Sequence, residues 1–463
     1  MPTLSPIRLE TLRRFDRPGP RYTSYPTAVE FDDAVGDETY RDKLAEADGA
    51  DSDAPLSLYV HIPFCRKHCD FCACHVIATP HRTVAEQYLD YLEREIAIVA
   101  GRLPHRRDLI QIHWGGGTPT YLSSAEVERL YRALERHFDV LEGAEIGIEV
   151  DPRVTTREHL LSLAELGFNR LSMGVQDPDD EVQQAIGRGQ TWSETVELIE
   201  SAREIGFSEG INCDLVYGLP RQRQESWEES LDDVIELRPD RLAVYSFAFV
   251  PWMKFNQKRL TTDDFPSPKE KLELYLAALN RFLAAGYEPI GMDHFALPDD
   301  ELAVAARQGR LERNFMGYTV KPVSTMIGLG VSAIGDLEGA YFQNEKKLST
   351  YYAALDRDRL PIERGRLLDD DDLLRRDVIM QIMCNFGVDK RRVEERYRID
   401  FDDYFAASLA RLADLEEEGF VVDTAEAIEV RGAGRLFVRN AAMAFDRYLA
   451  EKQQQKPTFS RTV

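Results

Sequence analysis

The chain of 463 residues has few cysteines, no long apolar run and a deficit of positive charge. Its 6 cysteines are too few for a secreted domain held together by disulfides. No run of about 18 apolar residues occurs, and the polar start, residues 1–8, does not resemble a secretory signal. We therefore expect a cytoplasmic protein without stable membrane association. The formal net charge of −24 disfavours a nucleic-acid partner, which would require a basic surface.

Four of the cysteines lie close together, directly after an apolar segment, Leu56–Ile62, that predicts a buried strand. Their spacing suits a soft metal centre, and three thiolates on a cubane iron–sulfur cluster would leave one iron open to a small molecule. Two alternatives remain open from spacing alone. One is a zinc site completed by His68 or His75, and the other is cysteine packing along one face of a helix. The clustered cysteines are Cys65, Cys69, Cys72 and Cys74.

Apolar segments of strand length recur along the first half of the chain and alternate with amphipathic helices. Several of these helices are expected to begin with a capping box, a Ser or Thr followed three residues later by Glu. The boxes recur about every 35 residues, the length of a βα unit, so the pattern predicts a parallel sheet with right-handed crossovers. The predicted strands are 56–62, 110–114, 146–150, 170–175, 211–217 and 241–247, and the boxes are Thr83/Glu86, Ser123/Glu126, Thr155/Glu158, Thr191/Glu194 and Ser226/Glu229.

Polar or small residues are expected at the carboxyl ends of these strands. In a barrel they would share the mouth at which barrels place their chemistry. They are the cysteine segment, Gly115–Pro119, Glu149, Gln176, Asp214 and Ala248. On pattern alone, a flat doubly wound sheet remains possible.

Four stretches are expected along the chain. Residues 1–54 form an N-terminal arm, 55–250 a (βα)6 barrel core, 251–362 a barrel extension with substrate-side elements, and 363–463 a helical C-terminal domain. The last stretch reads as a helix at 404–418, a small hairpin of strands at 420–423 and 427–431, and a helix at 436–449, a pattern that resembles a winged helix. The tail at 452–456 is expected to be mobile.

The cysteine segment resembles the signature of radical S-adenosylmethionine (SAM) enzymes, whose three-cysteine loop holds a [4Fe-4S] cluster. Further segments are similar to oxygen-independent coproporphyrinogen III oxidases, and they run over nearly the whole chain. They are 20–27, 113–120, 149–153, 170–177, 214–220, 291–296 and 384–386. The resemblance implies an α/β fold, a partial (βα)6 TIM-type radical SAM barrel with an N-terminal arm and a mostly helical, winged-helix-like C-terminal domain.

The resemblance also implies a set of site residues. The cluster ligands would be Cys65, Cys69 and Cys72, with Cys74 not ligating. The family binds two SAM molecules. Positions matching contacts to the SAM on the cluster are Tyr59, Phe71, Gly116, Glu149 and Ile334. Those matching contacts to the second SAM are Gly117, Thr118, Gln176, Arg188, Asp214 and Ala248. Arg188 has a plainer interpretation as a solvated helix residue, and Arg21 is a candidate for holding a substrate propionate on charge and position alone.

The implied reaction converts two propionate side chains of coproporphyrinogen III to vinyl groups, giving protoporphyrinogen IX in haem biosynthesis. A radical formed from SAM would remove a hydrogen from each propionate, and carbon dioxide and one electron would leave. The implied partners are this tetrapyrrole, a low-potential electron donor and an unidentified electron acceptor, with the enzyme a monomer. The alternatives are a related cluster-bearing protein that binds or delivers haem, and a radical SAM methyltransferase that modifies haem.

Overall fold

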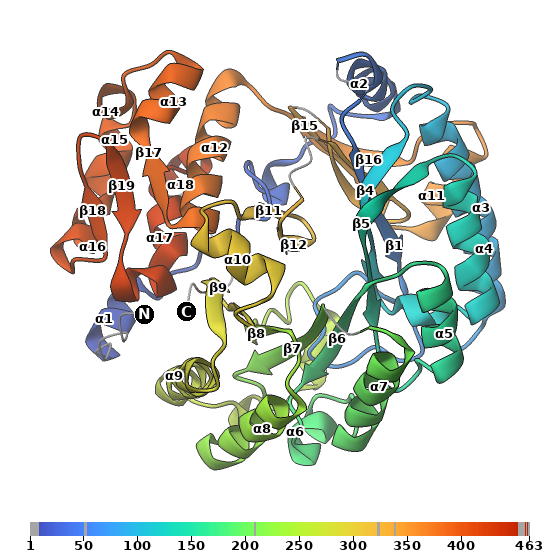
Figure 1. The fold of residues 1–463 in the computed structure, drawn as a ribbon, viewed down its shortest axis with the longest axis horizontal. Helices are drawn as coiled ribbons and strands as arrows, with labels where there is room; N and C mark the ends of the chain where they lie inside the picture. The colour runs from blue at the N-terminus through green and yellow to red at the C-terminus, as the bar shows by residue number, and fades with distance from the viewer. Residues whose placement is uncertain are drawn as a thin grey trace. The chain divides into compact units, whose positions relative to one another are not determined.

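The computed structural model describes residues 9–50, 53–207, 210–321, 325–337, 339–451, 459 and 461 (Figure 1). The chain divides into two compact units. The larger unit comprises residues 31–285 and 321–367, and the smaller comprises 1–30, 286–320 and 368–463. The four stretches expected from the sequence divide the chain by its composition, whereas these units divide it by contacts in the fold. The four stretches remain a prediction. The tail at 452–456 lies outside the described residues.

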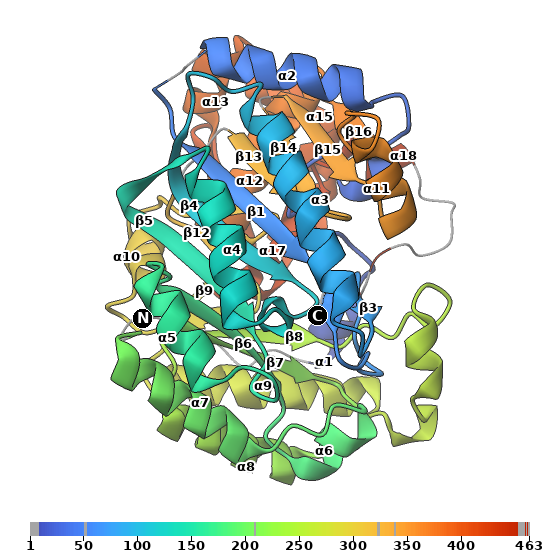
Figure 2. The ribbon, with the colours of Figure 1, turned by 90° about the vertical axis from the view of Figure 1, so that its right-hand side faces the viewer.

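The larger unit is built on parallel strands that lie side by side in chain order, β1-β4-β5-β6-β7-β8. Helices follow these strands and cover one face of the curved sheet (Figures 1 and 2). This arrangement confirms the expected (βα)6 barrel. The strands are β1 Leu56–Ile62, β4 Asp108–Gly116, β5 Asp139–Val150, β6 Arg170–Gln176, β7 Ile211–Tyr217 and β8 Arg241–Ser246. The helices are α3 Thr83–Ala100, α4 Ser124–Glu135, α5 Arg157–Glu165, α6 Asp180–Ala185, α7 Trp192–Ile205, α8 Gln224–Leu237 and α9 Pro268–Ala284.

The expected capping boxes are partly right. The structure shows complete boxes at Ser123 and Thr191. At α5 the box lies one residue later than expected, because Thr156 caps the helix and His159 returns the bond in place of a Glu. The boxes expected at the starts of α3 and α8 are wrong. These helices have Arg82 and Arg223 at the N-cap, and neither side chain makes a cap hydrogen bond.

The sheet continues beyond β1 in a way that the sequence pattern did not reveal. A late strand, β13, pairs parallel to β1, and three antiparallel pairings then add β14, β15 and β16. These strands are β13 Thr325–Leu329, β14 Ile334–Leu337, β15 Ala340–Asn344 and β16 Ile362–Leu367, and they are accompanied by helices α2 Asp37–Ala50 and α11 Leu348–Leu355.

A buried carboxylate, Glu95 on α3, ties the turn after β13 to its neighbours. It accepts hydrogen bonds from the Gly330 N–H at 2.7 Å, the Asn344 amide at 2.6 Å and the Tyr351 hydroxyl at 2.6 Å. Burial raises its pKa to about 7, although all three hydrogen bonds favour the ionised form. Glu95 therefore fixes the turn that leads into β14.

The smaller unit contains two short hairpins and a mainly helical C-terminal part. The strand order in its small sheet, β17-β19-β18, includes the expected hairpin. The single helix expected at 404–418 is wrong, since the segment is broken into short pieces. The elements are α1 Leu9–Phe15, β9 Glu288–Gly291, β10 His294–Ala296, α10 Glu301–Arg307, β11 Glu312–Asn314, β12 Gly317–Thr319, α12 Asp370–Asn385, β17 Gly387–Asp389, α13 Lys390–Tyr397, α14 Phe401–Tyr404, α15 Ala406–Leu409, α16 Ala413–Glu417, β18 Val421–Asp423, β19 Ala427–Val430, α17 Val438–Met443 and α18 Arg447–Glu451.

Candidate active site

The cysteine loop, residues 63–82, joins β1 to α3 and contains the short parallel pair β2 Phe64–Cys65 and β3 Ile77–Ala78. No helix forms in this loop, so cysteine packing along a helix face is wrong. All of the cysteines are described and are free thiols. The loop therefore presents Cys65 on a short strand and the other three thiols on irregular backbone, all after the first barrel strand.

The loop thiols have different neighbours. Cys65 Sγ lies 3.3 Å from Thr118 Oγ1, whereas Cys72 and Cys74 act on each other, which lowers the pKa of the Cys72 thiol and raises the pKa of the Cys74 thiol. As the side chains stand, no group of three or more metal-ligating side chains forms among the described residues.

The backbone of this loop is held from a distant part of the chain. Asn256 lies in a 3₁₀ helix, η3 Phe255–Arg259, and its side-chain amide donates to three loop carbonyl oxygens. The oxygens belong to Cys69 at 3.0 Å, Asp70 at 3.2 Å and Cys72 at 2.9 Å. Sequence reasoning missed this residue, because nothing in its local pattern distinguishes a structural amide from an exposed one.

Gln257, the next residue, adds a second clamp. Its side-chain amide donates to the carbonyl oxygens of Phe71 at 2.9 Å and Ala248 at 3.1 Å, and it accepts from the Val250 N–H at 2.6 Å. Gln257 is fully buried. It therefore links the cysteine loop to the segment that leaves β8.

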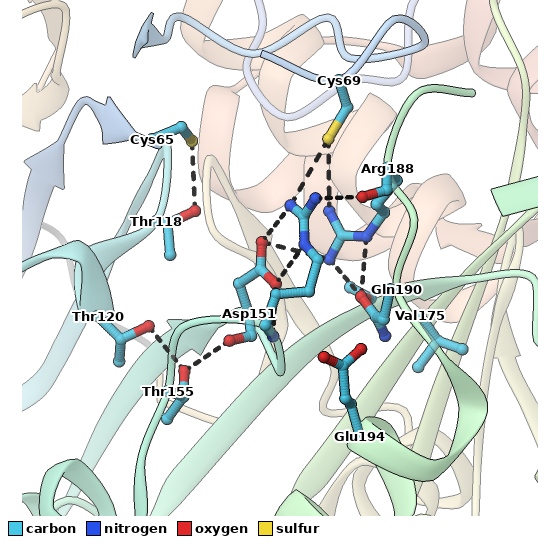
Figure 3. A network of polar contacts seen from close by, with 12 residues as sticks. Cys65, Cys69, Thr118, Thr120, Asp151, Thr155, Val175, Arg188, Gln190 and Glu194 are labelled. Carbon is cyan, nitrogen blue, oxygen red and sulfur yellow. Dashed lines mark hydrogen bonds and ion pairs between the residues drawn. The ribbon is translucent and has the colours of Figure 1, made fainter. Parts of the chain in front are cut away.

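Cys69 lies beside two arginines that share one carboxylate (Figure 3). Its sulfur accepts from Arg153 at 3.7 Å and from Arg188 at 3.9 Å. Asp151 lies 2.6 Å from the Arg153 guanidinium and 3.6 Å from that of Arg188. Burial alone would raise the pKa of Asp151, but the two arginines lower it below its ordinary value. The two cations outnumber the one carboxylate, so this end of the loop carries a net positive charge.

Arg188 is not a solvated helix residue, and that interpretation is wrong. Helix α6 ends at Ala185, and only 9% of the Arg188 side chain is exposed. Its guanidinium also donates to the Gln190 side-chain oxygen at 2.9 Å and to the Gly174 carbonyl at 2.8 Å. Arg188 is therefore held in place at the carboxyl end of β6.

A cavity of about 240 Å³ opens beside Cys65. Basic, acidic and aromatic side chains line this cavity. Cys65, Thr118 and the Asp151–Arg153 ion pair all border it. The lining residues are Cys65, Arg66, Lys67, Thr118, Tyr121, Asp151, Arg153 and Val154.

The triple glycine, 115–117, lies at the end of β4 and packs against neighbouring parts of the chain. Gly116 has a φ of +124°, and a Cβ there would lie 2.7 Å from the His61 ring. A Cβ on Gly117 would lie 2.6 Å from the Pro63 carbonyl oxygen, and one on Gly115 would lie 2.8 Å from the Glu149 carboxylate. Close approach to neighbouring residues therefore already requires glycine at these positions.

Glu149, near the end of β5, is an ionised carboxylate with 43% of its side chain exposed. It accepts from the Gly116 N–H at 2.9 Å, and His113 Nε2 lies 3.8 Å from its other oxygen. Burial alone would raise its pKa, but His113 and the Gly116 N–H lower it below the ordinary value. An ionised carboxylate that is partly exposed can accept hydrogen bonds from an ammonium group or from ribose hydroxyls.

His61 is neutral, because burial lowers its pKa to about 4. Its Nδ1 lies 3.0 Å from the Tyr59 hydroxyl, and its Nε2 lies 3.2 Å from the His75 carbonyl oxygen. These contacts are consistent with a proton on Nε2, with Tyr59 donating to Nδ1. His61 thus connects the end of β1 to the cysteine loop.

The other predicted residues lie in several settings. Gln176 ends β6 with a φ of +72°, a strained conformation that often marks functional sites. Ala248 follows β8, and Ile334 begins β14. Phe71 packs beside a buried apolar cluster that includes Ile186. The expectation that Asp214 ends its strand is wrong, because it lies in the middle of β7.

Arg21 lies in the smaller unit. Its guanidinium is 2.6 Å from the Asp293 carboxylate. It is therefore part of an ion pair within that unit.

No helix in the described part of the chain is long and apolar enough to span a membrane.

The barrel and its cysteine loop define the class of protein. Residues 59–234 match the model of the radical SAM superfamily, and residues 368–437 match that of the HemN C-terminal domain.

Similarity to curated proteins extends over nearly the whole chain. The oxygen-independent coproporphyrinogen III oxidase of Escherichia coli (strain K12) is 45% identical over 455 residues, which cover 98% of each chain. That of Pseudomonas aeruginosa is 44% identical over 456 residues, again 98% of each chain. A solved structure of coproporphyrinogen III oxidase (HemN) from Escherichia coli matches with a TM-score of 0.89 at 46% identity, covering 93% of this chain and 98% of that one. The chain belongs to the family of oxygen-independent coproporphyrinogen III oxidases, which are radical SAM oxidoreductases.

This family uses a [4Fe-4S] cluster and SAM, two molecules of which bind in the family, and the residues present suit both. Three loop cysteines offer soft sulfur ligands, and Arg153 and Arg188 supply positive charge beside one of them. The comparisons support neither a haem-delivery protein nor a haem-modifying methyltransferase.

Proposed function

We propose that this chain converts two propionate side chains of coproporphyrinogen III to vinyl groups, giving protoporphyrinogen IX. The observation that carries this proposal is the cysteine loop, clamped at the barrel mouth with two guanidinium groups on Cys69, in a chain similar to coproporphyrinogen III oxidases from end to end. Each round removes one hydrogen atom, one carbon dioxide and one electron from a propionate. Two rounds therefore require an electron acceptor as well as the donor that reduces the cluster.

We assign the cluster to Cys65, Cys69 and Cys72, leaving Cys74 outside the ligand set. The bound cluster and SAM together supply the radical that starts the reaction. The chain supplies charge balance, since Arg153 and Arg188 lie against the Cys69 sulfur. Asn256 fixes the loop backbone without using any of the thiols.

The SAM contacts that the resemblance implies are proposed at the same positions. The ionised Glu149 would accept hydrogen bonds from the SAM on the cluster, with Tyr59, Phe71, Gly116 and Ile334 beside it. The second SAM is proposed to bind at Gly117, Thr118, Gln176, Arg188, Asp214 and Ala248. The neutral state of His61 leaves Glu149 without a competing cation on that side.

We further propose that the enzyme is a cytoplasmic monomer that takes electrons from a low-potential donor and binds neither nucleic acid nor a membrane stably. The net charge of −24 supports the absence of nucleic acid and of anionic membranes as partners. The sparse, unpaired cysteines are consistent with a reducing compartment.

Anaerobic turnover tests the proposal. After cluster reconstitution, the enzyme is supplied with dithionite, SAM and coproporphyrinogen III, and 5′-deoxyadenosine and porphyrin products are followed by mass spectrometry. We expect stepwise loss of two carboxyl groups. Cys69→Ala should abolish it, whereas Cys213→Ala, which removes a buried thiol on β7, should not. Deoxyadenosine without decarboxylation would retain the radical chemistry and refute the substrate.

A further inference from the structure

A buried arginine, two of whose guanidinium nitrogens have no partner among the described residues, lies in the smaller unit. Arg313 is on β11 and only 8% exposed. Its Nε and Nη1 atoms are buried without a hydrogen-bond partner, and no ion pair of Arg313 is found among the described residues. Its guanidinium stacks on the ring of Tyr318, its partner across the β11–β12 hairpin, at 4.6 Å. A buried charge left in this state is costly, so its presence calls for an anion.

The surroundings of Arg313 do not supply that anion. The nearby carboxylate, Asp293, is already paired with Arg21 at 2.6 Å and has its other oxygen 2.9 Å from His294 Nδ1. Burial, opposed by Asp293 and reinforced by the two arginines, lowers the pKa of His294, so this imidazole is neutral. Arg21 and Arg313 both lie near Tyr318, and the carboxylate there, Asp293, is already paired with Arg21, which leaves Arg313 without an ion-pair partner among the described residues.

These groups form a continuous set of side chains. The His294 ring lies edge-on to Tyr318, with centroids 5.2 Å apart, and the Tyr318 hydroxyl donates to the Met383 carbonyl. A Cβ on Gly291 would overlap that hydroxyl, so this glycine leaves room for the aromatic ring beneath Arg313. Arg21 is the more open member, with 31% of its side chain exposed.

We propose that Arg313, with Arg21 beside it, binds a propionate carboxylate of the tetrapyrrole substrate. A carboxylate supplies the missing charge, and its two oxygens match the forked donors of a guanidinium group. Arg313 thus acts as a specificity-determining residue that selects a substrate bearing acidic side chains. This inference rests on the proposed function.

Binding without turnover tests the inference. Coproporphyrinogen III is equilibrated with the protein anaerobically in the absence of SAM, and SAM binding is measured separately. Arg313→Met should weaken coproporphyrinogen III binding at least about tenfold and leave SAM affinity unchanged. Arg310→Met removes an exposed arginine three residues earlier and should change neither affinity.

Thermal unfolding separates a binding role from a structural one. If Arg313 is poised for a ligand, the Met variant should unfold at the same temperature as the wild type or a higher one, because an unpaired buried charge is gone. A lower unfolding temperature with unchanged coproporphyrinogen III affinity would overturn the inference, as would a loss of SAM affinity in its place. Should Arg313→Met not fold, Arg313→Lys keeps the charge but loses the fork, and wild-type affinity in that variant would also overturn it. Failure of the wild type to bind coproporphyrinogen III would instead refute the proposed function.

Discussion

Replacing Asn256 with Asp should open the cysteine loop while leaving the rest of the barrel folded. The change keeps the size of the side chain but removes both N–H donors from three carbonyl oxygens and places a carboxylate oxygen against them. Each lost hydrogen bond costs about 0.5–1.5 kcal/mol, and the unpaired carbonyls and repulsion add to this, so we expect about 2–3 kcal/mol. At 1.4 kcal/mol per factor of ten, the loop should open roughly 30- to 140-fold more often.

Hydrogen exchange followed by mass spectrometry measures this opening directly. Peptides covering residues 66–74 should exchange faster by that factor, whereas peptides from β4 and β5 should not change. After reconstitution the variant should also retain less iron and sulfide per chain and lose iron faster to a chelator. Asn385→Asp is the matched control, because that amide makes a single 3.5 Å contact with the Leu311 carbonyl in the smaller unit. Exchange of the loop at the wild-type rate would refute the reasoning.

Two further predictions concern the barrel. Burial raises the pKa of Glu95 from 4.5 to about 7, so the folded protein holds a proton that the unfolded chain releases above about pH 4.5. The contribution of Glu95 to the free energy of unfolding is therefore full below that pH and falls by up to about 3 kcal/mol as pH rises to about 7. Glu95→Gln should remove this pH dependence of the free energy of unfolding, measured in urea between pH 4.5 and 7. An unchanged pH dependence would contradict the reasoning. Gly116→Ala should destabilise the protein by more than Gly143→Ala, because both glycines have positive φ but only Gly116 would push a Cβ into the His61 ring. Equal shifts in Tm would show that the His61 contact costs nothing.

The strands and helices of the barrel were predictable because each one carries its own signal. Period-two and buried apolar segments marked β1 and β4 through β8, and the capping boxes before α4 and α7 satisfied backbone donors that lie within three residues. At two helices that have no side-chain cap, the predicted capping boxes were wrong. Thr83 and Ser226 each have a Glu three residues later, as a capping box requires, but the N-cap residue of each helix is an arginine that makes no cap hydrogen bond.

The contacts that complete the site could not be predicted from local pattern, because they join residues far apart in the chain. Asn256 reaches the cysteine loop across more than 180 residues of sequence. Glu95 is paired with Tyr351, 256 residues later. Asp151 and Arg153 lie within a segment that the sequence analysis singled out, yet only the fold places the Arg153 guanidinium against Cys69 while Asp151 pairs with it. The assignments of individual cluster and SAM contacts remain predictions.

Asn256 and Gln257 hold the cysteine loop by hydrogen bonds to its main-chain oxygens and not to its side chains. Residues 65–74 therefore supply the chemistry, whereas the conformation of the loop is specified from η3. Because every amino acid offers the same carbonyl, these three hydrogen bonds require no particular side chain at positions 70 and 72, whereas Asp70 also pairs with Arg259 of η3 and Cys72 is assigned to the cluster. Chain length between Cys69 and Cys72 cannot be exchanged in the same way, since three oxygens must meet one amide in fixed register. Insertion or deletion between these residues is thus the change that the hydrogen bonds from Asn256 are least able to absorb.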